Sequence, residues 1–291
     1  MALDIEGDRS GLDPGKVTLA SPTIRFTQSN LHHSKSASAV LVRSLAKVHT
    51  GLALIQEPWI RDGEIRGLGG GGRLFCGPVD SPRTCILVKG LEAEILPDHC
   101  SRDLKAIRIR FILRGVARWL VVGSAYFPYD SEGPPPPEEV KKLIAECESK
   151  GVDLVLGCDA NSHNVVWGSS DCNTRGIRLL EYLVTTNLDV LNVGCKPTFR
   201  NAVREEVIDI TLVTRGLWGM IDGWRVSDEV SMSDHNHIVF EISEGLGTIQ
   251  RWRNPRKTNW AAYVEELAAK LSGFMGQLKS WTMSAGFSGE R

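Results

Sequence analysis

The chain has 291 residues, of which 42% are hydrophobic and 24% charged, and its formal net charge at neutral pH is −1. This composition predicts a globular protein with a sizeable core, and the charge balance alone does not indicate a nucleic-acid binder. No apolar run approaches the roughly 20 residues of a membrane span, and the N-terminus lacks the apolar stretch of a secretory signal. We therefore expect no membrane partner.

Seven cysteines are spread along the chain, and no pair has the Cys-x-x-Cys spacing of a zinc site. Several lie in apolar runs, where a thiol behaves as a small hydrophobic group. The cysteines therefore predict a reducing compartment with no disulfide framework and no zinc site.

The N-terminal part of the chain predicts a leader followed by a strand–helix–strand unit. Residues 1–22 have no periodicity, which is typical of a disordered leader. Alternation predicts a strand at 23–29, helical spacing a helix at 34–49, and a short apolar run a buried strand at 52–56. The glycine-rich segment 67–72 lacks the Lys-Ser/Thr of a phosphate-binding loop, so we interpret it as a hairpin tip.

The rest of the chain predicts a second unit of the same kind among many strands. Helices are expected at 138–150 and at 174–186, the latter with Ile177, Leu180, Leu183 and Val184 inward. Further strands are expected at 84–88, 93–96, 104–113, 119–126, 152–156, 188–193, 207–213, 221–226 and 238–242. The repeated strand–helix–strand pattern, near 23–57 and near 119–159, predicts two similar halves and a pair of packed sheets.

Basic residues gather in two places, between Arg102 and Arg118 and again at 251–257. Both are interpreted first as solvated faces, although the earlier cluster could also touch phosphates. From residue 245 the composition changes, and we interpret 245–291 as a basic linker outside a core domain of 23–244.

Polar groups stand where apolar strands end or begin. Asn30 closes the first strand, Glu57 follows the second, Asp159 and Asn161 follow the run at 152–156, and Ser233-Asp234-His235 precedes the last strand. Each group alone could be an ordinary turn, since Asp and Asn are common turn residues. Together they suit phosphate chemistry at one sheet edge, where open α/β folds bind ligands.

Asp209 lies among isoleucines in an expected buried strand, so its charge needs a partner. A histidine is a natural partner, because a carboxylate fixes its tautomer and stabilises its protonated form. The set offers hard oxygen ligands and no cysteine, which predicts Mg²⁺ or Mn²⁺ as the cofactor.

The order of these motifs resembles the exonuclease–endonuclease–phosphatase superfamily. The matching residues are Asn30, Gln56-Glu57, Ser124-Ala125-Tyr126, Gly157-x-Asp159-x-Asn161, Ile208-Asp209 and Ser233-Asp234-His235. A narrower resemblance, to the apurinic-type endonuclease domain of non-LTR (LINE-type) retrotransposons, rests on Asp159-Ala-Asn-Ser-His-Asn-x-x-Trp167-Gly-Ser, Pro197-Thr198-Phe199 and Arg253-Asn-Pro-Arg-Lys-Thr-Asn-Trp260. The resemblance covers residues 23–260.

The resemblance implies an α/β (α+β) fold: a four-layered α/β sandwich of two mixed β-sheets packed face to face, with helices outside. It implies divalent-metal-dependent hydrolysis of a phosphodiester in double-stranded DNA. In the retrotransposon branch this nicks one strand and leaves a 3′-hydroxyl that primes reverse transcription. The C-terminal linker would lead to a reverse transcriptase in the same polyprotein, made in the cytoplasm and acting in the nucleus.

Roles carried over from the family are hypotheses for this chain. Glu57 is the expected main metal ligand, with Asn30 helping to position the metal. Asp159 would orient or deprotonate the attacking water, and Asn161 would donate its amide to the phosphate.

The remaining catalytic candidates lie around the C-terminal motif. His235 is either a general base or a protonated donor to a non-bridging oxygen, and Asp209 would pair with it in either case. Asp234 would assist the metal or the leaving group. Tyr126 would hydrogen-bond the phosphate or the leaving oxygen, or else close the core as a strand-end aromatic.

Four further side chains, His163, Asn164, Thr198 and Arg175, are candidates to contact the DNA backbone or the flipped-out region near the nick. One position departs from the family pattern: His32 stands where some members carry an acid, so we expect a single metal at Glu57.

Two other functions remain open from the sequence. One is a phosphoesterase of the same superfamily acting on small phosphate esters. The other is a domesticated module that binds nucleic acid or protein without cleaving it. The presence of all expected catalytic side chains argues against the second.

Overall fold

The computed structural model describes residues 23–77, 80–113 and 116–243, together with Glu265 and Ala268. The chain divides into two compact units, Met1–Gly247 and Thr248–Arg291, and the fold below belongs to the first. The predicted leader, and the predicted linker apart from its two described residues, lie outside this range and stay predictions. No described helix is long and apolar enough to cross a membrane.

The first sheet has six strands in the order β15-β16-β1-β2-β6-β5. Helix α1 (Lys35–Ala46) connects its one parallel pair, β1 and β2, and the other neighbours are antiparallel. The strands are β15 (Ile221–Val226), β16 (Ile238–Ile242), β1 (Ile24–Asn30), β2 (Gly51–Gln56), β6 (Thr84–Lys89) and β5 (Arg73–Phe75).

The second sheet repeats this plan in the order β11-β14-β10-β9-β8-β7. Helix α2 (Glu138–Lys150) connects the parallel pair β9 and β10, and α3 (Thr174–Leu183) follows β10. The strands are β11 (Leu188–Val190), β14 (Asp209–Thr214), β10 (Asp153–Asp159), β9 (Val116–Tyr126), β8 (Leu104–Leu113) and β7 (Ala93–Cys100). The two strand–helix–strand units are confirmed, and β8 and β9 pair as antiparallel neighbours.

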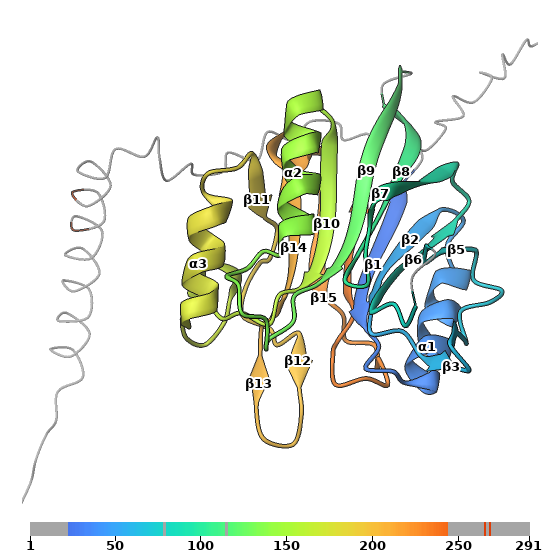
Figure 1. Cartoon of the computed structure of the whole chain (residues 1–291), viewed down its shortest axis with the longest axis horizontal. Coiled ribbons are helices and arrows are strands. Elements are labelled where there is room, and N and C mark those ends of the chain that lie inside the picture. Colours follow the sequence, from blue (N-terminus) through green and yellow to red (C-terminus); the bar gives the residue numbers. More distant parts are fainter. Residues whose placement is uncertain (1–22, 78–79, 114–115, 244–264, 266–267, 269–291) are drawn as a thin grey trace, which may run out of the picture. The chain divides into compact units, whose positions relative to one another are not determined.

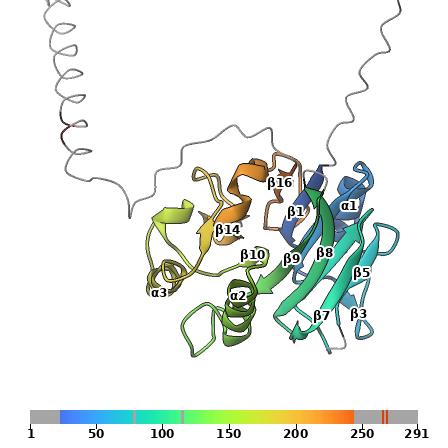
Figure 2. The ribbon, with the colours of Figure 1, turned by 90° about the horizontal axis from the view of Figure 1, so that it is seen from above.

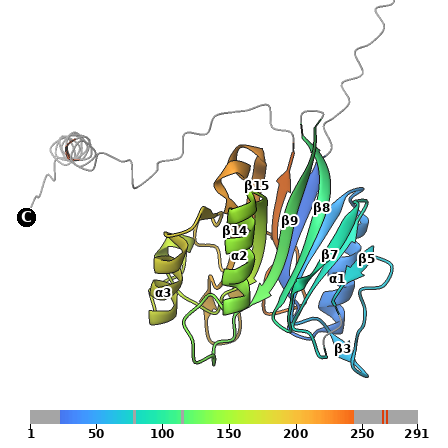
Figure 3. The same ribbon diagram turned by 45° about the horizontal axis from the view of Figure 1, so that its top comes forward.

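The sheets pack face to face, and helices cover their outer faces (Figure 1). Figure 2, seen from above, places α1 outside the first sheet and α2 and α3 outside the second. Figure 3 shows the same order of layers. One apolar cluster fills the space between the sheets, a second lies under α2 and α3, and a third under α1. The predicted four-layered α/β sandwich is therefore confirmed.

Local signals explain where the helices begin and end. Ser34 caps α1 by accepting the amide of Ala37, and α2 ends at Gly151, whose φ of 60° suits glycine. The inward face predicted for α3 was partly wrong: Ile177 and Val184 are exposed. The helix instead buries Gly176, Leu179 and Leu183, because the glycine lets it approach the backbone of His163.

Two short strand pairs were not predicted. They are β3 (Ile60–Arg61) with β4 (Glu64–Ile65), and β12 (Phe199–Arg200) with β13 (Glu205–Glu206). Strands of two residues are too short to show an alternating pattern. The β12–β13 hairpin extends beyond the ends of the sheets (Figure 1).

One edge of the sandwich collects the polar strand termini. The parallel strands β1, β2, β9 and β10 end at this edge, and their antiparallel neighbours β6, β8, β14 and β16 begin there. Asp159 at the end of β10 is therefore in register with Asp209 at the start of β14. A mixed sheet thus brings together residues that follow some strands and residues that precede others.

Buried side-chain amides join the two sheets near this edge. Gln28 of the first sheet donates to the carbonyls of Cys158 and Ile210, and it accepts from the hydroxyl of Thr211. Gly157 permits the close approach, since a Cβ there would lie 2.8 Å from the Gln28 side-chain oxygen. Apolar contact holds the two sheets together, and these hydrogen bonds in addition fix the position of one sheet relative to the other.

Replacing Gln28 by methionine keeps the approximate volume but removes these hydrogen bonds. We expect Gln28→Met to lower the free energy of unfolding by roughly 2 to 4 kcal/mol, since buried carbonyls lose their donor. Leu54→Met, an apolar exchange at the same interface, is the matched control and should cost less than about 1.5 kcal/mol. Urea denaturation measures both; a smaller loss for Gln28→Met than for the control would contradict the amide bridge.

Candidate active site

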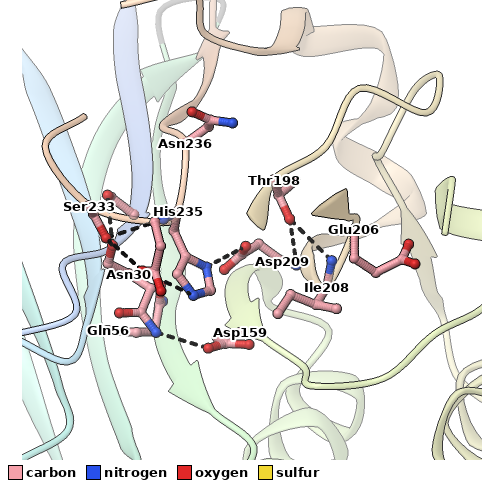
Figure 4. A network of polar contacts seen from close by, with 12 residues as sticks. Asn30, Gln56, Asp159, Thr198, Glu206, Ile208, Asp209, Ser233, His235 and Asn236 are labelled. Atoms are coloured by element: carbon pink, nitrogen blue, oxygen red, sulfur yellow. Dashed lines mark hydrogen bonds and ion pairs between the residues drawn. The ribbon is translucent and has the colours of Figure 1, made fainter. Parts of the chain in front are cut away.

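The site begins with a hydrogen bond between the sheets. The Asn30 side-chain nitrogen, at the end of β1, donates to the Asp159 carboxylate at 2.9 Å, and both residues are buried. Figure 4 shows this contact beside the imidazole of His235. Two residues 129 positions apart in the chain are thus held together at the predicted edge.

Asp209 and His235 form the buried ion pair that the sequence predicted. The His235 Nδ1 atom lies 2.8 Å from the Asp209 carboxylate (Figure 4). Burial lowers the pKa of His235, but the Asp209 carboxylate, with Asp159 and Asp234 nearby, outweighs burial and raises the pKa to about 9. The imidazole is therefore protonated at neutral pH, with Nδ1 donating to Asp209.

The surroundings of Asp159 disfavour its negative charge. Burial raises its pKa, and the neighbouring Asp209 and Glu57 carboxylates raise it further, while His235 and the Asn30 hydrogen bond act the other way. One ligand atom each of Asp159, Asp209 and His235 lies within 4.8 Å of the others. Such a carboxylate accepts a proton more readily than an exposed one, which suits a general base.

Tyr126 and Asn161 are the other two candidate residues next to Asp159. Burial raises the pKa of Tyr126, as do the Glu57 and Asp159 carboxylates, so its hydroxyl stays protonated and available as a donor. The Asn161 side-chain nitrogen donates to the Phe127 carbonyl at 3.2 Å, and its backbone amide donates to Asp159. The Asn161 side chain also hydrogen-bonds the Tyr126 side chain, and this contact acts to lower the pKa of Tyr126.

Two histidines of the β1–α1 connection face the two less buried acids. The His32 Nδ1 atom lies 2.9 Å from the Asp234 carboxylate, and His33 Nε2 lies 3.9 Å from that of Glu57. At the position where some family members carry an acid, this chain thus places an imidazole against Asp234.

Backbone strain concentrates at the same place. Seven of the described non-glycine residues have positive φ angles, and five of them lie in or beside the segments that carry the site: His32, His33, Glu57, Asn161 and Met232. Such conformations persist only where surrounding bonds enforce them, and they cluster at functional sites. The Glu57 amide, for example, is held by the carbonyl of Arg83 at 2.8 Å.

The donor set fits a hard divalent cation. The Glu57 side chain is 17% exposed, and the only Lys, Arg or His side chain within 4.0 Å of its carboxylate, among residues 23–243 as described, is that of His33. Within the described part of the chain, the Asn30 side-chain oxygen accepts only the His32 amide, and one Asp209 oxygen is buried without a hydrogen bond. Carboxylate and amide oxygens of this kind are ligands for Mg²⁺ or Mn²⁺.

The four predicted DNA contacts divide into two groups. Thr198 is 0% exposed and its hydroxyl accepts the amides of Ile208 and Asp209, while Asn164 is 4% exposed and caps a short helix by accepting the Val166 amide. The prediction that these two residues contact DNA directly is therefore corrected. Their side chains instead accept backbone amides of neighbouring segments.

His163 and Arg175 are partly exposed but already have partners. His163 Nδ1 lies 2.7 Å from the Asp171 carboxylate and 3.7 Å from that of Glu206. Arg175 donates to the Asn161 carbonyl and to the Ser131 hydroxyl, both at 3.2 Å. Burial lowers the pKa of Arg175. Their contact with DNA stays a prediction.

Comparison with known proteins shows the family of the chain. Residues 120–239 match the family described as endonuclease-reverse transcriptase. The endonuclease domain of TRAS1, a telomere-specific non-LTR retrotransposon, superposes with a TM-score of 0.62 at 30% identity, over 76% of this chain and 99% of that domain. An AP endonuclease from Leishmania major, 11% identical, shares the fold with a TM-score of 0.59 over 76% of this chain and 88% of its own.

A 115 kDa protein of the type-1 retrotransposable element R1DM of Drosophila melanogaster is 25% identical over 266 residues. The match covers 85% of this chain and 25% of that protein, so the chain spans about a quarter of the relative's length. The chain belongs to the endonuclease/exonuclease/phosphatase superfamily and, within it, to the endonuclease domains of non-LTR retrotransposons. It is accordingly a hydrolase of the nuclease type.

Sequence reasoning missed Arg83 and Asp103, which border the site. They precede β6 and β8, and their side chains form an ion pair. The sequence analysis looked mainly at polar residues that follow strands, whereas these strands run antiparallel and begin at the edge. The polar residues that precede expected antiparallel strands were the signal that could have identified them.

The raised pKa of His235 depends on Asp209 and can be tested directly. We expect Asp209→Asn to lower the pKa of His235 from about 9 towards its ordinary value of 6.5, because burial then opposes the positive charge with fewer carboxylates against it. NMR titration of ¹³C-labelled histidine measures this. Asp171→Asn, which removes an exposed acid beside His163, is the control and should leave the His235 titration unchanged. An unchanged titration in Asp209→Asn would contradict the assigned pair.

Proposed function

We propose that the chain is a divalent-metal-dependent DNA endonuclease, using Mg²⁺ or Mn²⁺, that nicks one strand of double-stranded DNA and leaves a 3′-hydroxyl to prime reverse transcription. The observation that carries the proposal is the buried Asn30–Asp159 and Asp209–His235 network beside the weakly paired carboxylate of Glu57. The matches to TRAS1 and R1DM support a retrotransposon context. A reverse transcriptase in the same polyprotein, and action in the nucleus, belong to the same proposal.

Glu57, with the side-chain oxygen of Asn30, would hold the metal, and Asp234 would assist. When bound there, the metal supplies positive charge that neutralises the phosphate oxygens. The protein's own groups orient the substrate around it.

The proton chemistry follows from the side-chain environments. Asp159, whose pKa is raised, accepts a proton from the attacking water. The protonated His235 donates from Nε2 to a non-bridging oxygen, with Asp209 holding its other nitrogen. Tyr126, which stays protonated, donates to the phosphate or to the leaving oxygen, and the Asn161 amide, which hydrogen-bonds the Tyr126 side chain, is the second proposed donor to the phosphate. The donor role is thus preferred over the base role for His235.

Plasmid nicking with Mg²⁺ tests this function. We expect the wild type to convert supercoiled plasmid to the open circle, and Glu57→Ala to be slower by roughly 10²-fold or more. Glu64→Ala, at an exposed glutamate paired with Arg66, is the control and should nick normally. Polymerase extension of the nick checks for the 3′-hydroxyl.

The outcomes separate the alternatives. Equal nicking by wild type and Glu57→Ala would reject the metal assignment. An absence of nicking by all three proteins would favour the binding module. Hydrolysis of a phosphomonoester in place of plasmid would favour a small-molecule phosphoesterase.

The pH dependence of nicking tests the role of His235. A donor loses its proton as the pH rises through about 9, so the turnover number should fall above that pH. On the acid side it should rise as Asp159 deprotonates. Rates measured from pH 6 to pH 10 at saturating DNA give the profile. A rate that continues to increase to pH 10 would show that His235 acts as a base.

A further inference from the structure

Arg83 and Asp103 form an ion pair at the site edge that the proposed chemistry does not use. The guanidinium Nε and Nη2 atoms each lie 2.5 Å from one oxygen of the Asp103 carboxylate, which makes the pair bidentate. The side chains are only 22% and 15% exposed. Such a fork fixes the plane of the guanidinium, which a lysine at this position would not do.

The pair contacts two of the candidate active-site residues. The guanidinium carbon lies 4.6 Å from the centre of the Tyr126 ring, and the Asp103 carbonyl accepts the Tyr126 amide at 2.9 Å. On the other sheet, the Arg83 carbonyl accepts the amide of Glu57, whose φ is 45°. The ring of Tyr126 is therefore held by side chain and backbone of one ion pair, and the same pair fixes the backbone of Glu57.

The pair also connects the sheets. Arg83 precedes β6 of the first sheet and Asp103 precedes β8 of the second, and the Arg83 amide donates to the Arg102 carbonyl at 2.8 Å. A shift of one sheet against the other would thus move the tyrosine hydroxyl relative to the glutamate carboxylate.

We propose that Arg83, fixed by Asp103, is a positioning residue for catalysis: its guanidinium sets the place of the Tyr126 hydroxyl relative to Glu57. This inference rests on the proposed function. It extends that function by assigning a role to two residues that make no contact with the reacting atoms.

The contact itself is tested without catalysis. ¹⁹F NMR of protein labelled with 3-fluorotyrosine gives one signal for each of four tyrosines, and Tyr126→Phe identifies the relevant one. We expect Arg83→Lys to move the Tyr126 signal and leave the other three in place. Asp103→Asn, which keeps the side-chain shape, should move it in the same way. An unmoved signal in both variants would overturn the proposal.

A comparable pair on β8 of the second sheet serves as control. Arg108 contacts one Glu94 carboxylate oxygen at 2.5 Å, and its guanidinium carbon lies 4.7 Å from the centre of the Trp119 ring, so it is a more exposed group of the same three residue kinds. Arg108→Lys should change neither the Tyr126 signal nor nicking.

Kinetics test the link to catalysis. We expect Arg83→Lys to lower the turnover number about 10- to 100-fold with little change in KM, because misplacement of a catalytic group weakens transition-state contacts. In the Tyr126→Phe background, which keeps the ring and removes the hydroxyl, the same substitution should have an effect below about threefold. Circular dichroism checks that each variant folds.

The two readouts separate the possible failures. An equal effect of Arg83→Lys in both backgrounds would show a structural role and overturn the positioning proposal, as would a moved ¹⁹F signal with an unchanged rate. If the wild type does not nick plasmid, the proposed function fails, and the catalytic role of Arg83 fails with it, whatever the ¹⁹F signal shows.

Discussion

The site depends on buried side-chain amides that cross from one sheet to the other. Gln28 and Asn30 of β1, and Gln56 of β2, each donate to groups of the second sheet, so the polar edge of one sheet is in fixed register with that of the other. Without these bonds two apolar faces could slide, since hydrophobic contact is not directional. Because Asn30 donates directly to Asp159, the constraint that joins the sheets also orients a candidate catalytic carboxylate.

Electrostatics divide the roles among similar side chains at this edge. Asp209 is beside His235 and stabilises its positive charge, whereas burial and the neighbouring carboxylates raise the pKa of Asp159. Glu57 remains weakly paired, and its strained backbone is held by Arg83. Carboxylates with different surroundings thus suit the three roles proposed for them: an orienting group, a base and a metal ligand.

The sequence allowed prediction of the features that leave a periodic or compositional signal. The buried strands, the two strand–helix–strand units and the Asp209–His235 pair were of this kind, since apolar runs and an isolated buried charge are visible in the residues. Thr198 and Asn164 were misassigned because a polar residue near a site has the same appearance whether it binds a ligand or caps a buried turn. Arg83 and the β12–β13 hairpin were missed, since sheet order and two-residue strands leave no local pattern.

The central claim is that residues from both sheets converge to hold a hard cation beside Asp159 and His235. Crystals soaked in Mn²⁺, with anomalous diffraction recorded near the manganese absorption edge, test it most directly. The account predicts an anomalous peak at the Glu57 carboxylate, next to the side chain of Asn30. A peak at the second cluster of possible ligands, His163, Asp171 and Glu206, with none at Glu57 would contradict it.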